Sequence, residues 1–427
     1  MVTTRSDRSD RIKAGPPAQT RRAVVEIVES DIEIITPVFG GGVTARGTQR
    51  RPDEVTPVRG TTVRGQLRFW WRALYGARYQ TVAELREAEG RLWGLASEPG
   101  WAVVNVDASK LKPPAPHPIF RVVVAPNGRR RCQAIDNDIG YAGFPLQPSD
   151  MEMRQNAEPA PAYVFDGTFL VRVTLSSVAD SATRDEVTQT LRCWRCFGGI
   201  GGRTRRGFGA LSAPAGATAD QLLSPAGARV AGVPLLAGAK VVLGARSNSA
   251  LIAWPQALHA LRQFRQGPTV GRNPGNEPNH PGRSRWPEPD TVRRMTQRSA
   301  PLHPPQHLVS EAAPRAQFGM PIILHFKDQG DPGDSMISPD GRDRYASPLI
   351  LRPFGTRANS RPMALLMGNR PDLQLVMKSD QKTGQPKARL TPQQVDQLHE
   401  SLRPHFRDAG GDAALAFMNF FQTQVSK

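Results

Sequence analysis

The chain has 427 residues, and its 56 Lys and Arg against 38 Asp and Glu give a formal net charge of +18. Such an excess is expected where the partner is a polyanion, and we favour nucleic acid over a lipid surface because the basic residues lie in Gly- and Pro-broken segments. No stretch approaches the roughly 20 apolar residues that span a bilayer, and three cysteines exclude a disulfide scaffold, so we expect a cytoplasmic protein without a membrane partner.

The N-terminal half predicts a ferredoxin-like fold. Residues 1–22 alternate Arg, Ser and Asp and are expected to form a disordered basic tail. A Val- and Ile-rich strand at 23–38 ends in a glycine turn, and 126–161 is expected to be a largely irregular insertion. The remaining predicted elements are helices at 61–75, 82–92 and 182–197 and strands at 101–106, 119–125, 165–175 and 208–212. This order predicts an antiparallel sheet with helices packed on one face.

A shift to Ala, Gly and Pro at 213–232 marks the predicted boundary between an N-terminal domain, 23–214, and a C-terminal domain, 215–427. The second domain repeats the pattern less clearly, with strands expected at 241–243, 321–326, 347–352 and 362–366 and helices at 254–266, 391–401 and 413–424. Residues 267–317 are dense in Pro, Gly, Arg and His and are expected to form a long excursion outside the core. The predicted fold class is therefore α+β, with two ferredoxin-like (RRM-like) domains and long insertions.

The first candidate site is the helix at 61–75. At about 100° per residue its apolar side chains form one stripe and its arginines form a second stripe about 120° away. The apolar stripe comprises Val63, Leu67, Trp70 and Leu74, and the basic one comprises Arg64, Arg68 and Arg72, with Arg59 just before the helix. The arginines could hold phosphates, although a solvated face on an ordinary core helix explains the stripe slightly better when it is taken alone.

The second candidate site is the glycine- and arginine-rich segment from Gly198 to Leu211. Gly201 and Gly202 would let the backbone approach a polyanion closely, and Arg203, Arg205 and Arg206 could contact phosphates. The segment follows a helix and precedes a strand, which is the reverse of both dinucleotide and ATPase phosphate loops. The alternative is a flexible surface hairpin.

The third candidate site is the run Gly282–Pro287 inside the long excursion. Trp286 could stack a base while Arg283 and Arg285 hold phosphate, or Trp286 could simply fold the loop onto the domain. The sequence leaves both interpretations open.

Cysteine and histidine patterns give no clear metal or catalytic motif. Cys193 and Cys196 have metal-ligand spacing, but no second pair matches them, so we interpret both as core residues and expect neither metal nor cofactor. If the protein were instead a metal-independent endoribonuclease that processes precursor RNA, its general base would be sought among His303, His307 and His325.

Several segments resemble the RAMP superfamily of CRISPR-associated proteins, and specifically the family of the first RAMP subunit of the type III-B (Cmr) effector complex. The resemblance rests on Ile35–Gly42, Val63–Arg72, Gly198–Leu211, Gly282–Pro287, Phe318–Ile323 and Ala346–Pro353. It implies two ferredoxin-like domains, binding of CRISPR RNA and complementary target RNA, and assembly with other RAMP subunits. It also implies that cleavage belongs to a different subunit, so no catalytic residue is expected here.

The leading hypothesis is therefore a non-catalytic, RNA-binding subunit of a CRISPR ribonucleoprotein that acts in antiviral defence. It requires the helix arginines and the loop arginines to converge on one surface. The rivals are the endoribonuclease and a scaffold whose arginines meet acidic protein neighbours.

Overall fold

The computed structural model describes residues 24–40, 56–95, 98–224, 227, 229–275, 282–380 and 382–425. The predicted basic tail at 1–22 lies outside these residues, as does most of the arginine-rich loop that follows the first strand. Within the described part of the chain, no helix combines the length and the apolar character needed to cross a membrane.

The N-terminal half has a ferredoxin-like strand order. Its antiparallel sheet runs β1 (Val24–Glu33), β7 (Thr168–Ser176), β2 (Ala102–Asp107). An isolated antiparallel bridge between Ile34 and Leu211 places the end of the predicted strand 208–212 beside the continuation of β1. In chain order this arrangement is 4-1-3-2, although the fourth member is reduced to single bridges instead of a continuous strand.

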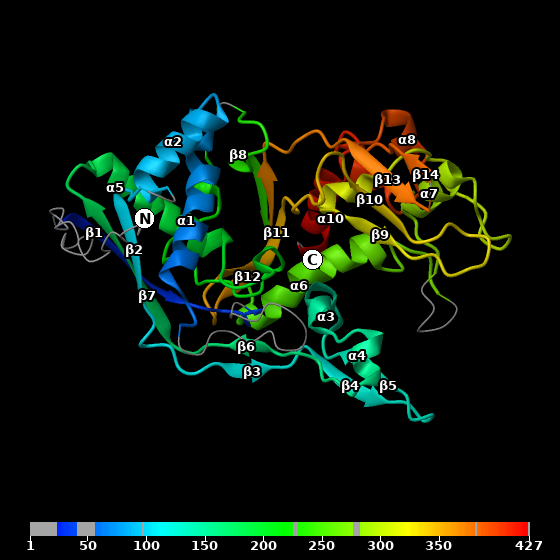
Figure 1. Cartoon of the computed structure of the whole chain (residues 1–427), viewed down its shortest axis with the longest axis horizontal. Coiled ribbons are helices and arrows are strands. Elements are labelled where there is room, and N and C mark those ends of the chain that lie inside the picture. The colour runs from blue at the N-terminus through cyan, green and yellow to red at the C-terminus, as the bar shows by residue number, and fades with distance from the viewer. Residues whose placement is uncertain are drawn as a thin grey trace, which may run out of the picture.

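Two helices cover one face of this sheet, and a third lies outside them (Figure 1). They are α1 (Gly60–Tyr75), α5 (Ser181–Phe197) and α2 (Val82–Trp93), which packs on α1. The apolar stripe predicted for α1 is confirmed, because all four of its members are buried. Asp180 caps α5 by accepting a hydrogen bond from the Thr183 amide, and a Thr81–Glu84 capping box begins α2.

The insertion at 126–161 is more regular than predicted. With the flanking segments it forms one hairpin, β4 (Phe120–Val124) with β5 (Arg130–Ala134), and the two short helices α3 (Asn137–Gly143) and α4 (Asp150–Arg154). The strands β3 (Ala115–His117) and β6 (Ala162–Val164) flank these elements and pair antiparallel with each other. The Asp136 carboxylate accepts from two amides at the start of α3, and Ser149 and Glu152 form a capping box on α4. These caps define helices too short to show an apolar period, which is why the sequence pattern predicted a loop.

The C-terminal half contains a second βαββα unit. Its elements are β8 (Leu235–Leu243), α6 (Ala250–Gln266), β11 (Leu349–Gly355), β12 (Ser360–Gly368) and α10 (Ala413–Val425), with the antiparallel order β11-β12-β8. These strands and helices match predicted ones, and the α+β class with antiparallel sheets is confirmed.

The β11-β12-β8 sheet is buried on both faces. Leu349 and Leu351 of β11 point into a core with α6 and α10, whereas Ile350 and Phe354 point into the core of the N-terminal half. This explains the near-continuous apolar run of β11, because a strand that is covered on both faces needs no alternation of apolar and polar residues. The strand β11 therefore contributes to two hydrophobic cores, one in each half of the chain.

A smaller unit is inserted into the C-terminal half. Its sheet has the order β14 (Lys382–Gly384), β13 (Leu375–Ser379), β10 (Ser335–Pro339), β9 (Ile322–Leu324), and α7 (Glu288–Thr296) packs on it. The short helices α8 (Pro392–Asp396) and α9 (Arg403–Arg407) instead contribute to the core around α6 and α10. The prediction that residues 267–317 stay outside a core is wrong. Trp286, Val292 and Ala312 are fully buried, because this segment supplies α7 and an aromatic anchor instead of a long loop.

Candidate nucleic-acid interface

The segment 198–211, here called the Gly-Arg loop, is clamped at both ends by one buried arginine of β11. The Arg352 guanidinium donates hydrogen bonds to the carbonyl oxygens of Gly198 and Leu211, and its Nε donates to the Pro353 carbonyl at 2.9 Å. Burial lowers the pKa of Arg352 to about 10, so it remains charged at neutral pH. The strand motif at 346–353 thus positions the loop from the other half of the chain.

The glycines of the loop allow it to pack closely on the chain, and the approach of a polyanion predicted at Gly201 and Gly202 stays a prediction. Gly201 has φ +75°, and a Cβ there would lie 2.7 Å from a Val38 methyl carbon. The Gly202 amide donates to the Phe39 carbonyl at 2.7 Å. Both residues therefore dock the loop on the segment that follows β1.

The three loop arginines diverge. Arg206 points inward, where its guanidinium donates to the Leu349 carbonyl at 2.8 Å and to the Ser347 hydroxyl at 3.1 Å. Arg205 donates to the Ser347 carbonyl at 2.6 Å. Arg203 and Arg205 each lie near a different aromatic ring, on two sides of the loop. Among the described residues, the hydrogen-bond acceptors of Arg205 and Arg206 are carbonyl and hydroxyl oxygens, and no described carboxylate pairs with either side chain.

The first side is a cavity of about 520 Å³, here called the Phe144 pocket. The Arg203 guanidinium carbon lies 4.6 Å from the centre of the Phe144 ring. Arg265 donates to the Tyr141 hydroxyl at 2.8 Å, while its Nε is buried without a hydrogen-bond partner. The described lining contains three arginines and no carboxylate, and it comprises Phe120, Ala134, Gly140, Tyr141, Ala142, Phe144, Gln147, Arg203, Arg206, Arg265 and Gln266.

The second side is a smaller cavity of about 200 Å³, here called the Phe69 pocket. Its described lining comprises Gln66, Phe69, Trp70, Phe197, Gly198, Thr204, Arg205 and Ile350. The Arg205 guanidinium carbon lies 5.9 Å from the centre of the Phe69 ring, and the buried Trp70 Nε1 has no hydrogen-bond partner. Each side of the Gly-Arg loop therefore pairs an arginine with an aromatic ring, a combination suited to phosphate and base.

A larger cavity of about 560 Å³ elsewhere also contains arginines, but a buried carboxylate compensates two of them. Asp412 accepts from Arg370 at 2.9 Å and from Arg389 at 3.0 Å. The positive charges of these two arginines are neutralised by Asp412, which distinguishes this cavity from the two beside the Gly-Arg loop.

The arginine stripe of α1 faces α2 and not the Gly-Arg loop, so the prediction that the two converge on one surface is wrong. Arg64 Nε donates to the Trp93 carbonyl at 2.7 Å, and Arg68 Nε donates to the Glu89 carboxylate at 2.5 Å. Arg72 donates to the same carboxylate, whose side chain is only 6% exposed. The predicted RNA contacts of these arginines lose their geometric basis, because the guanidinium groups hold the C-terminal turn of α2. The carbonyl of Arg59 caps α1 by accepting from the Val63 amide, and the contact predicted for its side chain stays a prediction.

The base-stacking role predicted for Trp286 is wrong, because this side chain is fully buried. It packs edge-on against Phe264 at 5.4 Å between ring centres, and its Nε1 donates to the Phe264 carbonyl at 3.2 Å. Arg283 pairs with the buried Asp290 at 2.8 Å, and Arg285 donates to Asn273 Oδ1 at 2.8 Å. The motif anchors the segment to the core, which is the second of the two interpretations left open by the sequence.

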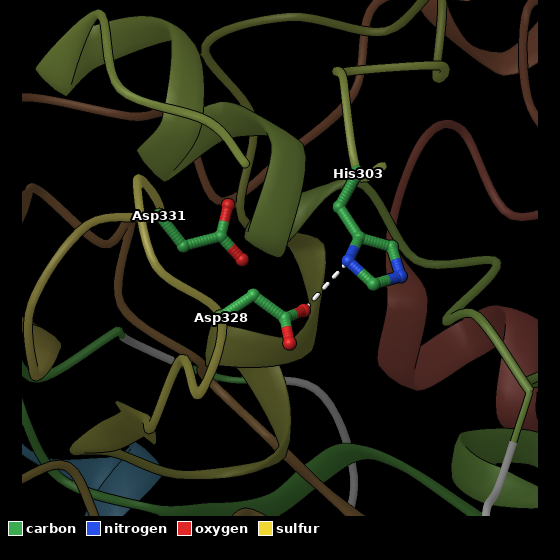
Figure 2. Close-up of side chains that lie close together, drawn as sticks. All are labelled: His303, Asp328 and Asp331. Carbon is green, nitrogen blue, oxygen red and sulfur yellow. Dashed lines mark ion pairs between the residues drawn. The ribbon is translucent and has the colours of Figure 1, made fainter. Parts of the chain in front are cut away.

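The histidines named for a nuclease lie apart from both pockets' linings. His307 Nε2 is 2.8 Å from the Ser284 carbonyl, and the exposed His325 is paired with Asp334. His303 Nδ1 lies 2.6 Å from an Asp328 carboxylate oxygen, with Asp331 next to them (Figure 2).

In the described part of the chain, one group of three His, Cys, Asp or Glu side chains could hold a metal ion, and it consists of His303, Asp328 and Asp331. Asp331 binds Arg293 with both carboxylate oxygens, at 2.9 and 2.8 Å, and accepts from the Ala300 amide. These hydrogen bonds lower the pKa of Asp331 and use most of its acceptor capacity. The arrangement is accounted for by the Arg293 ion pair.

The cysteine pair lies in the core, as interpreted from the sequence. Cys193 and Cys196 are fully buried, and burial raises the pKa of Cys196 to about 11. Both are therefore thiols packed against apolar neighbours at neutral pH.

Sequence reasoning missed Tyr141, Phe144 and Arg265. The first two lie in the insertion that was predicted to be irregular, and Arg265 ends a helix whose apolar face dominated the pattern. A phenylalanine flanked by glycine and proline, as in Gly143-Phe144-Pro145, was the only local signal of an aromatic ring held at a turn.

Comparison with known proteins finds a family model that matches part of the chain. A model of the RAMP superfamily matches residues 31–212. This part of the chain is therefore similar to proteins of the RAMP superfamily. It runs from the end of β1 to the last residues of the Gly-Arg loop, so it includes α1 and both loop arginines that lie beside aromatic rings.

Among proteins with curated descriptions, no match to the chain is found. One solved structure that resembles this chain is Cmr1 from Pyrococcus furiosus in its apo form, at 16% sequence identity. The match covers 82% of this chain and 90% of that chain, with a TM-score of 0.43. Another is a chain of the type III-B Cmr-beta complex bound to cognate target RNA, at 10% identity, covering 94% of this chain and 100% of that chain with a TM-score of 0.45.

Proposed function

We propose that this protein is an RNA-binding subunit of a type III-B (Cmr) CRISPR effector complex and acts in antiviral defence. Its ligands are CRISPR RNA and complementary target RNA, its protein partners are other RAMP subunits, and its compartment is the cytoplasm. The observation that carries the proposal is the Gly-Arg loop, which sets an arginine beside an aromatic ring on each of its two sides.

Electrostatics support this assignment. The Arg205 and Arg206 guanidinium groups bond to carbonyl and hydroxyl oxygens, so the charge of the loop is available to an anion. Arginine binds phosphate through paired N–H donors, and a base that stacks on an aromatic side chain contributes about 1–3 kcal/mol. The net charge of +18 favours the same partner through long-range attraction.

We also propose that the subunit does not cleave RNA. The described linings of the Phe144 and Phe69 pockets contain arginine, glutamine, threonine and aromatic side chains but no histidine or carboxylate. A metal-independent nuclease needs a general base within hydrogen-bond reach of the attacking hydroxyl. RNA held at these pockets would meet no described histidine or carboxylate that could act as a general base.

The test is binding of single-stranded RNA by the full chain with Arg203→Ala and Arg205→Ala combined. Loss of two charge-assisted contacts, each worth about 1.5 kcal/mol, should weaken binding on the order of 100-fold in filter binding. The slope of log affinity against log salt should fall by about 1.4, since about 0.7 is lost per phosphate contact. Arg86→Ala, on the exposed face of α2, is the matched control and should bind as the wild type does.

Unchanged affinity of the double variant would remove the loop from the RNA site. The same RNA, incubated with the protein in EDTA, should stay intact. The exposed His303 beside Asp328 is the best-placed general base outside the pockets, so specific cleavage that is abolished by His303→Ala would overturn the non-catalytic assignment.

A further inference from the structure

We propose that the Phe144 pocket holds one nucleotide of a single-stranded RNA, with its base against Phe144 and its phosphate on Arg203 and Arg265. The inference deepens the proposed function and rests on it. It assigns a defined subsite to the insertion at 126–161, which lies beside the Gly-Arg loop in the fold.

An exposed ring provides the stacking surface. Phe144 is 59% exposed, so its ring is open to solvent, and the Arg203 guanidinium lies 4.6 Å from the ring centre. A phosphate bound by that guanidinium carries its ribose and base next to the ring. Arginine and phenylalanine thus form a stacking platform with the charge already in place.

An incompletely used arginine points to the phosphate. Arg265 gives one guanidinium N–H to the Tyr141 hydroxyl, while its Nε is buried without a partner. The second terminal nitrogen of Arg265 has no hydrogen bond to a described residue, and the side chain lines the cavity, so this group can donate to a phosphate there. Arg203, Arg206 and Arg265 line the same cavity, and none of its other described lining residues is a carboxylate. The three guanidinium groups repel one another, and an anion between them would relieve that repulsion.

The cavity has the size and edge chemistry for one nucleotide. Its volume of about 520 Å³ lies within the usual range of roughly 300–1,000 Å³ for small-ligand sites. Gln147 and Gln266 lie in the lining, and each amide can both donate to and accept from the edge of a base. Because either amide can rotate to suit a base, we expect a tolerant site with modest preference among the four bases.

The subsite is held rigid by contacts outside it. Asp138 on α3 pairs with Arg262 of α6 at 2.5 Å and with His259 at 3.1 Å. These pairs fix the helix that carries Tyr141 and precedes Phe144 against the helix that carries Arg265. Three segments far apart in sequence are therefore pre-positioned, which lowers the entropy lost on binding.

The experiment uses RNA oligomers that carry one 2-aminopurine at successive positions, with the full chain. We expect the fluorescence of one position to be quenched by stacking, and Phe144→Ala to abolish that quenching and weaken binding about 10-fold. Phe144→Tyr, which keeps the ring, should retain both. Phe144 is exposed, so the thermal midpoints of both variants should match the wild type and exclude misfolding as the cause.

The outcomes separate the subsite from the proposed function. Tight RNA binding without position-specific quenching, or with equal behaviour of the Ala and Tyr variants, would overturn the subsite and leave the function standing. Absence of any RNA binding would overturn both. If 2-aminopurine riboside monophosphate were quenched while Phe144→Ala left RNA affinity unchanged, the pocket would serve a free nucleotide, and its assignment to the RNA strand would be overturned.

Discussion

Arg352 shows how one side chain connects the fold to the candidate site. It is fully buried in β11, belongs to neither pocket lining, and donates to three carbonyl oxygens, those of Gly198, Leu211 and Pro353. Two of these oxygens mark the ends of the Gly-Arg loop. A buried acceptor that loses its donor costs about 1–3 kcal/mol, so the loop's position depends strongly on this one guanidinium.

We therefore predict that Arg352→Met lowers the free energy of unfolding by about 3 kcal/mol or more and weakens RNA binding without removing any proposed RNA contact. Urea unfolding followed by tryptophan fluorescence measures the first effect. Arg407→Met, at an exposed position of α9, is the control and should be nearly neutral. Normal stability of the Arg352 variant would contradict the clamp.

At the scale of elements, the packing of α1 against α2 explains the arginine stripe. The carboxylate of Glu89 accepts from both Arg68 and Arg72, and Arg64 and Arg68 reach the carbonyl oxygens at the end of α2. Cations at a helix C-terminus are favourable because of the exposed carbonyl groups there. The arginine stripe thus joins α1 to α2 through ion pairs and hydrogen bonds.

Glu89→Ala should consequently destabilise the protein by about 2 kcal/mol, since two half-exposed guanidinium groups lose their shared carboxylate. The RNA affinity of the folded protein should not fall. Glu87→Ala, at an exposed position of the same helix, serves as the control and should change neither the stability nor the RNA affinity. A loss of RNA affinity at unchanged stability would instead support the stripe as an RNA contact.

The sequence predicted local features such as helices and their buried faces, but it did not predict which distant residues each side chain contacts. The apolar period of α1 predicted its bounds and its buried stripe, because a helix repeats every 3.6 residues whatever it packs on. The direction of Arg68 depends on Glu89, 21 residues away, and the burial of Trp286 depends on Phe264. The Phe144 pocket needs three separate segments, which no local pattern brings together.

At the scale of the whole molecule, the Gly-Arg loop lies where the two halves meet. The loop lies in the part of the chain that matches the RAMP-superfamily model, but its clamp and the acceptors of Arg205 and Arg206 come from β11 and the residues just before it. Because β11 also contributes to both hydrophobic cores, the loop is held by the folding of the entire chain. RNA binding and the docking of the two halves should therefore be lost together.

The central claim is that RNA follows the Gly-Arg loop between the Phe144 and Phe69 pockets. Photo-crosslinking of the full chain to single-stranded RNA containing 4-thiouridine, followed by mass spectrometry of the adducted peptides, tests it most directly. RNA that follows this path should give adducts at Tyr141 or Phe144 and at Phe69. Adducts confined to the outer face of α2 or to the sheet β14-β13-β10-β9 would contradict it.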